Sequence, residues 1–255
     1  MLIPLELTES RTEAVVKNSA KSASDVMRSY RYERKFLVEN HSPHSVEGAV
    51  HLHPAQFHRI YPPRFVNNIY LDTALLRNYR EAVDGIASRL KARIRWYGNL
   101  FATGASPCLE LKGKEGNVCH KSVFPLKDFT FTTGMGTRDI DVLLTESQLP
   151  AAIRSYIGLM KPVLVNRYRR KYWRSRDGHY RLTLDHNLWF SGFNVFANEY
   201  LQQTTEFKNI IVEVKYDPQA DEHFSDISNR FGFRQSRSSK YVAGIEHIYH
   251  LSNSR

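Results

Sequence analysis

Basic residues occupy every second position in one strand-like segment of this sequence, residues 86–97 (IASRLKARIRWY). Successive side chains of a β-strand point to opposite faces, so this spacing places the cations in one column and the apolar side chains behind them. The column holds Arg89, Lys91, Arg93 and Arg95. Because a guanidinium group binds two phosphate oxygens at once, such a column suits an anion rich in phosphate groups.

Five other strand-like segments repeat this pattern, and most of them place a carboxylate beside the cations. The shared faces hold Arg31, Glu33 and Lys35 in 31–38, Glu110, Lys112 and Lys114 in 107–114, Tyr168 and Arg170 in 163–174, Arg181, Thr183 and Asp185 in 179–190, and Glu213 and Lys215 in 209–216. A few carboxylates among many cations suit a divalent metal ion held jointly with phosphate oxygens. This is the chemistry of a triphosphate or a longer phosphate chain.

The segments that carry these residues predict an α+β fold built on an eight-stranded antiparallel β-barrel with flanking helices. In such a barrel the apolar sides face the helices and the charged sides face a wet lumen, because burying unpaired ions costs several kcal/mol each. The expected strands are 31–38, 66–72, 86–97, 107–114, 118–125, 163–174, 179–190 and 209–216. The expected helices are 43–60, 73–82, 138–160, 221–230 and 241–251.

The domain boundaries follow from composition. Residues 1–29 show little periodicity and are expected to form a flexible leader, and 30–255 are expected to form a single tunnel domain. Pro62 and Pro63 are expected to stop the first helix, and the segment 138–160 is expected to contain one or two helices, with Pro150 between them.

The charge balance narrows the possible partners. The chain has 255 residues, 36 basic against 26 acidic, and a net charge of +10. No helical segment is rich in Lys and Arg, so nucleic acid is not expected as a partner. Cys108 and Cys119 form neither a disulfide framework nor a zinc motif, and no apolar run is long enough to span a bilayer. The expected location is the cytoplasm.

Two aspartates allow alternative interpretations. Asp72 precedes a predicted helix, so it either caps that helix or contributes to a metal site. Asp185 shares a strand face with Arg181, and it either orients that guanidinium through an ion pair or contacts a metal. Tyr168 and Tyr241 are expected to support neighbouring cations by hydrogen bonding or packing.

The order of these motifs resembles the catalytic domain of the vacuolar transporter chaperone (VTC) polyphosphate polymerases, within the CYTH-like triphosphate tunnel superfamily. The resemblance covers about residues 30–248 and rests on the ordered motifs RYERKFLV, NNIYLDT, LKARIRWYG, LELKGK, YRRKYWRSRDGHYRLTLD, IIVEVKYD and RSSKYVAGI. It implies an eight-stranded tunnel in which the γ-phosphate of ATP is transferred to a growing inorganic polyphosphate chain, with Mn²⁺ or Mg²⁺ as cofactor.

The resemblance also implies roles for individual residues. Catalytic cations that hold phosphates are expected at Lys35, Arg93, Arg95, Lys112, Arg170, Arg181, Arg237 and Lys240. Further phosphate or cofactor contacts are expected from Lys91, Lys114, Lys121 and Lys215. Glu213 matches the metal-binding glutamate of the family, and Glu33 and Glu110 are the other metal candidates. Arg237 is a mild departure, because the first residue of that basic pair is often Lys.

One departure bears on the reaction. The hydrolytic branches of the superfamily carry Glu-x-Glu-x-Lys on the first strand, whereas this sequence carries Arg31-x-Glu33-x-Lys35. Hydrolysis requires a metal-held water, so the loss of a carboxylate favours a polymerase over a triphosphatase. The alternatives are a CYTH-type triphosphatase and a non-catalytic module that binds polyphosphate or an inositol polyphosphate. Coupling to transport would need a separate membrane partner.

Overall fold

One curled antiparallel sheet organises the molecule. The computed structural model describes residues 31–101, 106–115, 118–193 and 205–250, so the predicted leader 1–29 lies outside the described residues. The ten strands of the sheet run in the order β10-β1-β9-β7-β6-β2-β3-β4-β5, with β8 paired to β7. The strands are β1 (Tyr32–Val38), β2 (His58–Asp72), β3 (Ser88–Tyr97), β4 (Cys108–Glu115), β5 (Val118–Pro125), β6 (Lys161–Arg174), β7 (Tyr180–Gly192), β8 (Thr205–Phe207), β9 (Ile210–Tyr216) and β10 (Gln235–Ser236).

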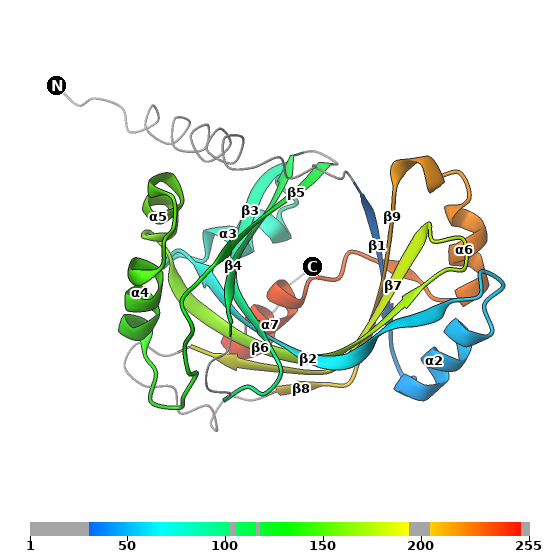
Figure 1. The fold of residues 1–255 in the computed structure, drawn as a ribbon, viewed down its shortest axis with the longest axis horizontal. Coiled ribbons are helices and arrows are strands. Elements are labelled where there is room, and N and C mark those ends of the chain that lie inside the picture. The colour runs from blue at the N-terminus through cyan, green and yellow to red at the C-terminus, as the bar shows by residue number, and fades with distance from the viewer. Residues whose placement is uncertain (1–30, 102–105, 116–117, 194–204, 251–255) are drawn as a thin grey trace.

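The sheet curls into two walls joined by a floor, as Figure 1 shows. Strands β3, β4 and β5 form one wall, β1, β9 and β7 form the other, and the long strands β2 and β6 cross between them. We call the space on the concave side of the sheet the tunnel. This arrangement confirms the predicted α+β class with flanking helices.

The outer faces of both walls pack against helices. The helices are α2 (Pro43–His51), α3 (Arg77–Val83), α4 (Thr137–Glu146), α5 (Ala151–Ile157), α6 (Phe224–Phe231) and α7 (Lys240–Tyr249). On the first wall, Ile94 and Trp96 of β3 join Ile140 of α4 and Ile153 of α5 in one apolar cluster. On the second wall, Phe36, Val212 and Leu182 pack with residues of α2 and α6. The apolar alternation therefore faces outward, as predicted.

Helix α7 lies on the concave side and fills one part of the tunnel with apolar side chains. Tyr241 and Ile245 pack against Leu164 and Phe190 of the sheet. Gly244 permits this close approach, since a Cβ atom there would lie 2.5 Å from Leu164 Cδ2 and 2.6 Å from Phe190 Cδ1. The Ser239 hydroxyl caps α7 by accepting a hydrogen bond from the Val242 N–H at 3.4 Å.

A side-chain contact, in place of backbone pairing, connects the two walls across the tunnel. Among the described residues, the sheet ends at β5 on one side and at β10 on the other, so the predicted barrel is not closed by hydrogen-bonded strands. Glu33 of β1 instead binds Lys112 of β4 at 2.9 Å across the tunnel.

The helix predicted over 43–60 is shorter than expected. It ends at His51, and the chain re-enters the sheet as β2 at His58, well before the predicted start of that strand at residue 66. Pro62 and Pro63 lie inside β2, where the register with β6 shifts twice. Proline donates no hydrogen bond, and these irregular positions do not require one.

Other boundaries agree more closely. The segment 138–160, expected to hold one or two helices, forms α4 and α5 on either side of Pro150. Helix α6 ends at Phe231 and is followed by Gly232 with a φ of 65°. The short strands β8 and β10 were not predicted. In the part of the chain that the structure describes, no helix is long and apolar enough to cross a membrane.

Candidate functional site

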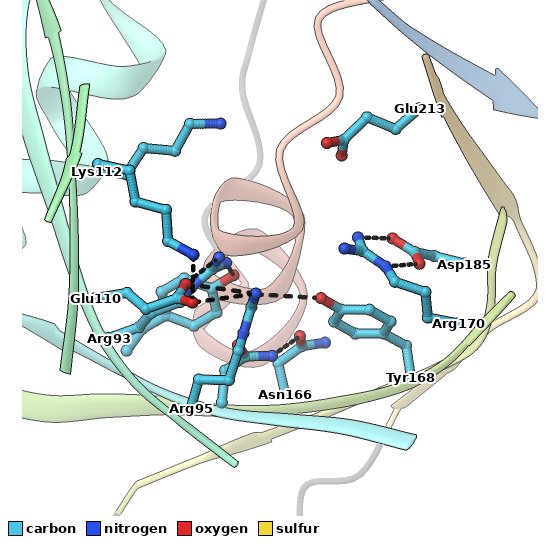
Figure 2. Close-up of polar contacts among 12 residues, drawn as sticks. Arg93, Arg95, Glu110, Lys112, Asn166, Tyr168, Arg170, Asp185 and Glu213 are labelled. Carbon is cyan, nitrogen blue, oxygen red and sulfur yellow. Dashed lines mark hydrogen bonds and ion pairs between the residues drawn. The ribbon is translucent and has the colours of Figure 1, made fainter. Parts of the chain in front are cut away.

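Charged side chains from both walls and the floor point toward one another inside the tunnel, as Figure 2 shows. They form three clusters, each centred on a carboxylate. The Glu110 cluster contains Glu110, Arg93, Arg95 and Lys121, the Asp185 cluster contains Asp185, Arg170 and Lys240, and the Glu33 cluster contains Glu33, Lys35, Lys112, Lys215 and Glu213.

The Glu110 cluster lies on the first wall and is centred on a buried carboxylate, since Glu110 is 3% exposed. Arg93 donates to Glu110 Oε2 through Nε at 2.8 Å and Nη2 at 2.7 Å, and Lys121 binds Oε1 at 2.6 Å. Burial would raise the pKa of Glu110, but Arg93, Arg95 and Lys121 lower it to about 2. Glu110 is therefore ionised at neutral pH and forms ion pairs with three cations.

Two asparagines fix the orientation of Arg95 from below. Arg95 is only 6% exposed, and its Nε donates to the Asn68 side-chain oxygen at 2.9 Å. Asn68 in turn donates to Asn166, which donates to the backbone carbonyl of Trp189 on β7. Arg95 also donates to the Tyr168 hydroxyl at 3.4 Å. The floor therefore holds this guanidinium in one direction, toward the tunnel.

The Asp185 cluster corrects one interpretation of the sequence. Asp185 is fully buried and accepts a two-pronged interaction from Arg170, with Nε at 2.6 Å and Nη2 at 2.7 Å from its two oxygens. Lys240 of α7 adds a contact at 2.6 Å. Among the described residues no ion pair joins Asp185 to Arg181; the carboxylate orients Arg170 from the neighbouring strand instead. Tyr168 supports this group as predicted, with Arg170 and Lys240 over its ring at 5.3 and 4.8 Å.

The Glu33 cluster contains more lysines than carboxylates. Glu33 binds Lys35 at 3.1 Å, Lys112 at 2.9 Å and Lys215 at 3.6 Å. Burial and the nearby Glu213 would raise the pKa of Glu33, but the three lysines lower it to about 2.

Glu213 has the fewest ion-pair partners of the carboxylates in the three clusters, counted over the described residues. Within the described part of the chain it forms an ion pair with Lys215 alone, at 2.7 Å, whereas Glu33 and Glu110 each bind three cations. Burial would raise the pKa of Glu213, but Lys215, Lys35 and Arg170 hold it well below its usual range. The described residues contain no group of three or more metal-binding side chains. A Mg²⁺- or Mn²⁺-type ion at Glu213 would therefore take most of its ligands from phosphate and water.

Lys91 differs from the other cations of the tunnel. Among the described residues it forms no ion pair, and its ammonium donates to the Ser239 hydroxyl at 3.0 Å and lies 5.9 Å above the ring of Tyr241. Burial, together with Lys35 and Arg89, lowers the pKa of Lys91 to about 7. Part of the Lys91 population is therefore neutral at physiological pH.

Besides Lys91, other sequence-predicted cations lie apart from the three clusters. Arg181 and Arg237 are exposed and form no ion pair with any described residue. Lys114 lies in β4 opposite Arg89, and its side chain is outside the described structure. Arg31, whose face was expected to line the tunnel, instead forms an exposed ion pair with Asp217 at 3.4 Å.

Sequence reasoning missed the polar residues that support the cations. Asn68, Asn166, Tyr70 and Ser239 each bind a tunnel residue or its partner. Asn68 and Asn166 were detectable in principle, because a buried amide inside an apolar strand requires a partner. Asp72 was expected either to cap a helix or to contribute to a metal site. Its carboxylate accepts hydrogen bonds from the N–H groups of Asn78 and Tyr79 in the first turn of α3, which begins at Arg77. It also accepts from the N–H group of Thr73 and the hydroxyl of Tyr241.

Comparison with known proteins identifies the family. Residues 30–249 match the family model described as the VTC domain. Because this match spans most of the chain, the protein belongs to the VTC domain family. A search of curated proteins found no match.

Several solved structures share a low similarity with this chain. A candidate adenylate cyclase from Vibrio parahaemolyticus is 14% identical with a TM-score of 0.49, over 85% of this chain and 99% of that one. HpAC1 from Hippeastrum, a candidate adenylyl cyclase described as having a dominant triphosphatase activity, is 17% identical with a TM-score of 0.49, over 84% and 94%. PH1819 from Pyrococcus horikoshii OT3 is 15% identical with a TM-score of 0.46, over 84% and 99%. These similarities are too low to transfer an activity.

Proposed function

We propose that this protein is a polyphosphate polymerase that transfers the γ-phosphate of ATP to the end of an inorganic polyphosphate chain. The observation that carries the proposal is the convergence of guanidinium and ammonium groups from both walls and the floor on the tunnel, with Arg93 and Arg170 each held by a carboxylate. Fixed cations on two sides can hold two phosphate groups in line. Membership of the VTC domain family supports the same substrate class.

The reaction needs little beyond this positioning. A terminal oxygen of the polyphosphate chain attacks the γ-phosphorus, the bond to the β,γ-bridging oxygen breaks, and ADP leaves. The transition state is loose, and its charge lies on the non-bridging oxygens, so catalysis depends on alignment and charge neutralisation. Arg93 and Arg95 approach from one side, and Arg170 with Lys240 approaches from the other. No general base is required.

Glu213 is the residue we expect to hold the divalent ion, with Mn²⁺ or Mg²⁺ as the candidates. When bound, such an ion would neutralise charge on the phosphate oxygens. Glu33 and Glu110 serve a different purpose in this proposal. Each pairs with three cations and offsets part of their positive charge, which limits their mutual repulsion.

Arg93→Ala tests the proposal against the alternative of a binding module. The purified variant should keep its fold, because only one arm of the Glu110 cluster is removed, and its ATP turnover should be abolished. Arg138→Ala, an exposed position of α4, is the matched control. Polymer synthesis by Arg93→Ala at the normal rate would contradict the proposal. Tight polyphosphate binding by the native protein with unchanged ATP would support the binding module. ATP hydrolysed to ADP and free phosphate without polymer would indicate a triphosphatase.

The cytoplasmic location and a separate membrane partner remain predictions.

A further inference from the structure

A second group of side chains lies on the concave face beside the phosphate-binding cations. Arg64 of β2 lies between two tyrosines, with its guanidinium carbon 4.1 Å from the ring centroid of Tyr97 and 5.1 Å from that of Tyr172. Its Nε donates to the Tyr172 hydroxyl at 2.8 Å. Tyr61 meets the Tyr172 ring edge-on at 5.7 Å. We call Arg64, Tyr61, Tyr97 and Tyr172 the tyrosine cluster.

Strand register places this cluster next to the phosphate site. Arg64 pairs directly with Arg170, the arginine held by Asp185. Directly opposite residues of antiparallel strands have Cβ atoms only about 5 Å apart on the same face. On β3, Tyr97 lies two residues beyond Arg95 and shares its face. The cluster therefore continues the tunnel lining by one further side chain on the same face of β3 and of β6.

The chemistry of the lining changes at this point. Within the tunnel, Arg93 and Arg170 are bound to carboxylates, whereas no described carboxylate forms an ion pair with Arg64. Tyr61 and Tyr97 are 59% and 41% exposed, so both residues are accessible to a ligand. Flat exposed rings beside a guanidinium are surfaces on which a nucleobase stacks.

We infer that the tyrosine cluster binds the nucleobase of the nucleotide whose phosphates enter the tunnel. The inference rests on the proposed function, because it requires a nucleoside triphosphate as donor. The base stacks on the exposed ring of Tyr97, and Arg64 interacts with the edge of the base or with the phosphate nearest the ribose. Since every base has a π-face, the cluster selects for a nucleoside over bare phosphate, with purines favoured by their larger rings.

The test compares two ligands that differ in the nucleoside. Binding of ATP and of inorganic triphosphate is measured by calorimetry, without turnover, on the native protein and on Tyr97→Ser, Tyr97→Phe and Tyr61→Ser. We expect Tyr97→Ser to weaken ATP binding about tenfold, in line with base–aromatic stacking, and to leave triphosphate binding unchanged. Tyr97→Phe, which keeps the ring, should bind ATP like the native protein. Tyr61→Ser should weaken ATP selectively by a smaller factor.

Equal weakening of both ligands by Tyr97→Ser would overturn the inference, because it would indicate a structural role in holding β2. Unchanged binding of both ligands to Tyr97→Ser and Tyr61→Ser would overturn it as well. Tyr61 is the more exposed residue, so Tyr61→Ser keeps the test valid if Tyr97→Ser fails to fold. The proposed function is tested separately, since polymer synthesis is measured by a different assay and need not fail when base selectivity does.

Discussion

Glu33 of β1 and Lys112 of β4 connect the two walls of the tunnel, with the Lys112 ammonium 2.9 and 3.1 Å from the two Glu33 oxygens. These strands are not neighbours in the sheet, so this side-chain contact joins parts of the molecule that backbone pairing leaves apart. It also places a carboxylate where phosphate oxygens are expected to bind. A phosphate chain entering the tunnel must therefore compete with Glu33 for the lysines.

Glu33→Gln should consequently bind inorganic triphosphate several-fold more tightly than the native protein in the absence of metal. The neutral amide no longer compensates Lys35, Lys112 and Lys215, so more of their charge is available to the ligand. Calorimetry at constant ionic strength measures the change. Glu81→Gln, which alters an ion pair on α3 outside the tunnel, is the control. Weaker binding by Glu33→Gln would show that the carboxylate assists the phosphate.

Glu110→Gln should lower the free energy of unfolding by about 3 kcal/mol, because it leaves cations in a buried site without their counter-charge. Arg93, Arg95 and Lys121 lower the folded-state pKa of Glu110 to about 2, whereas an unperturbed glutamate has a pKa of about 4.5. Its stabilising contribution is therefore present above pH 4.5 and is lost as the pH falls toward 2. Denaturant titrations between pH 7 and pH 3 should show a shallower pH dependence for the variant.

The matched control is Glu146→Gln, which removes an exposed ion pair with Lys127 and should change stability little. Inorganic triphosphate should raise the melting temperature of Glu110→Gln more than that of the native protein. A loss of stability no larger than that of the control would contradict the role assigned to Glu110.

Binding of a phosphate chain near neutral pH should be accompanied by proton uptake at Lys91. Its pKa of about 7 leaves the amine largely neutral at pH 8, and a nearby phosphate restores the charged form. Affinity for triphosphate should therefore fall as the pH rises above 7. Calorimetry in buffers of different ionisation enthalpy counts the protons, and Lys91→Met should remove the uptake. The same proton count for Lys91→Met and the native protein would contradict this prediction.

Arg170→Lys should reduce polymer synthesis at least tenfold although the charge is retained. The lysine cannot reproduce the two-pronged contact with Asp185, so the direction of the cation toward the tunnel is lost. Arg169→Lys, the exposed neighbour on the other face of β6, should behave like the native protein. Steady-state kinetics with ATP distinguishes the two. Equal effects of both substitutions would show that orientation of Arg170 is unimportant.

The period-2 pattern was sufficient to predict the faces of the main strands. Arg93, Arg95 and Glu110 lie together because alternation fixes which side each residue takes once the apolar side is buried. The partner of a given cation was less predictable, since it depends on the register between strands. One of the two interpretations of Asp185 was an ion pair with Arg181 on its own strand, but cross-strand pairing places Arg170 opposite it.

Two other features needed the three-dimensional structure. The length of β2 was underestimated because Pro62 and Pro63 are strong stop signals, and only the irregular pairing with β6 permits them inside a strand. The lowered pKa of Lys91 also depends on contacts between segments that are far apart in the sequence. Ser239 and Tyr241, its contacts at the start of α7, lie about 150 positions away in the sequence.

The most direct test of the central claim is a ³¹P NMR time course of the purified protein with ATP and Mn²⁺ at low concentration, or with Mg²⁺ where paramagnetic broadening interferes. We predict that the signal of internal polyphosphate phosphates grows in step with ADP, and that Arg95→Ala abolishes both. Growth of inorganic phosphate with ADP, without internal phosphates, would contradict a polymerase, as would ATP that remains unchanged while polyphosphate binds.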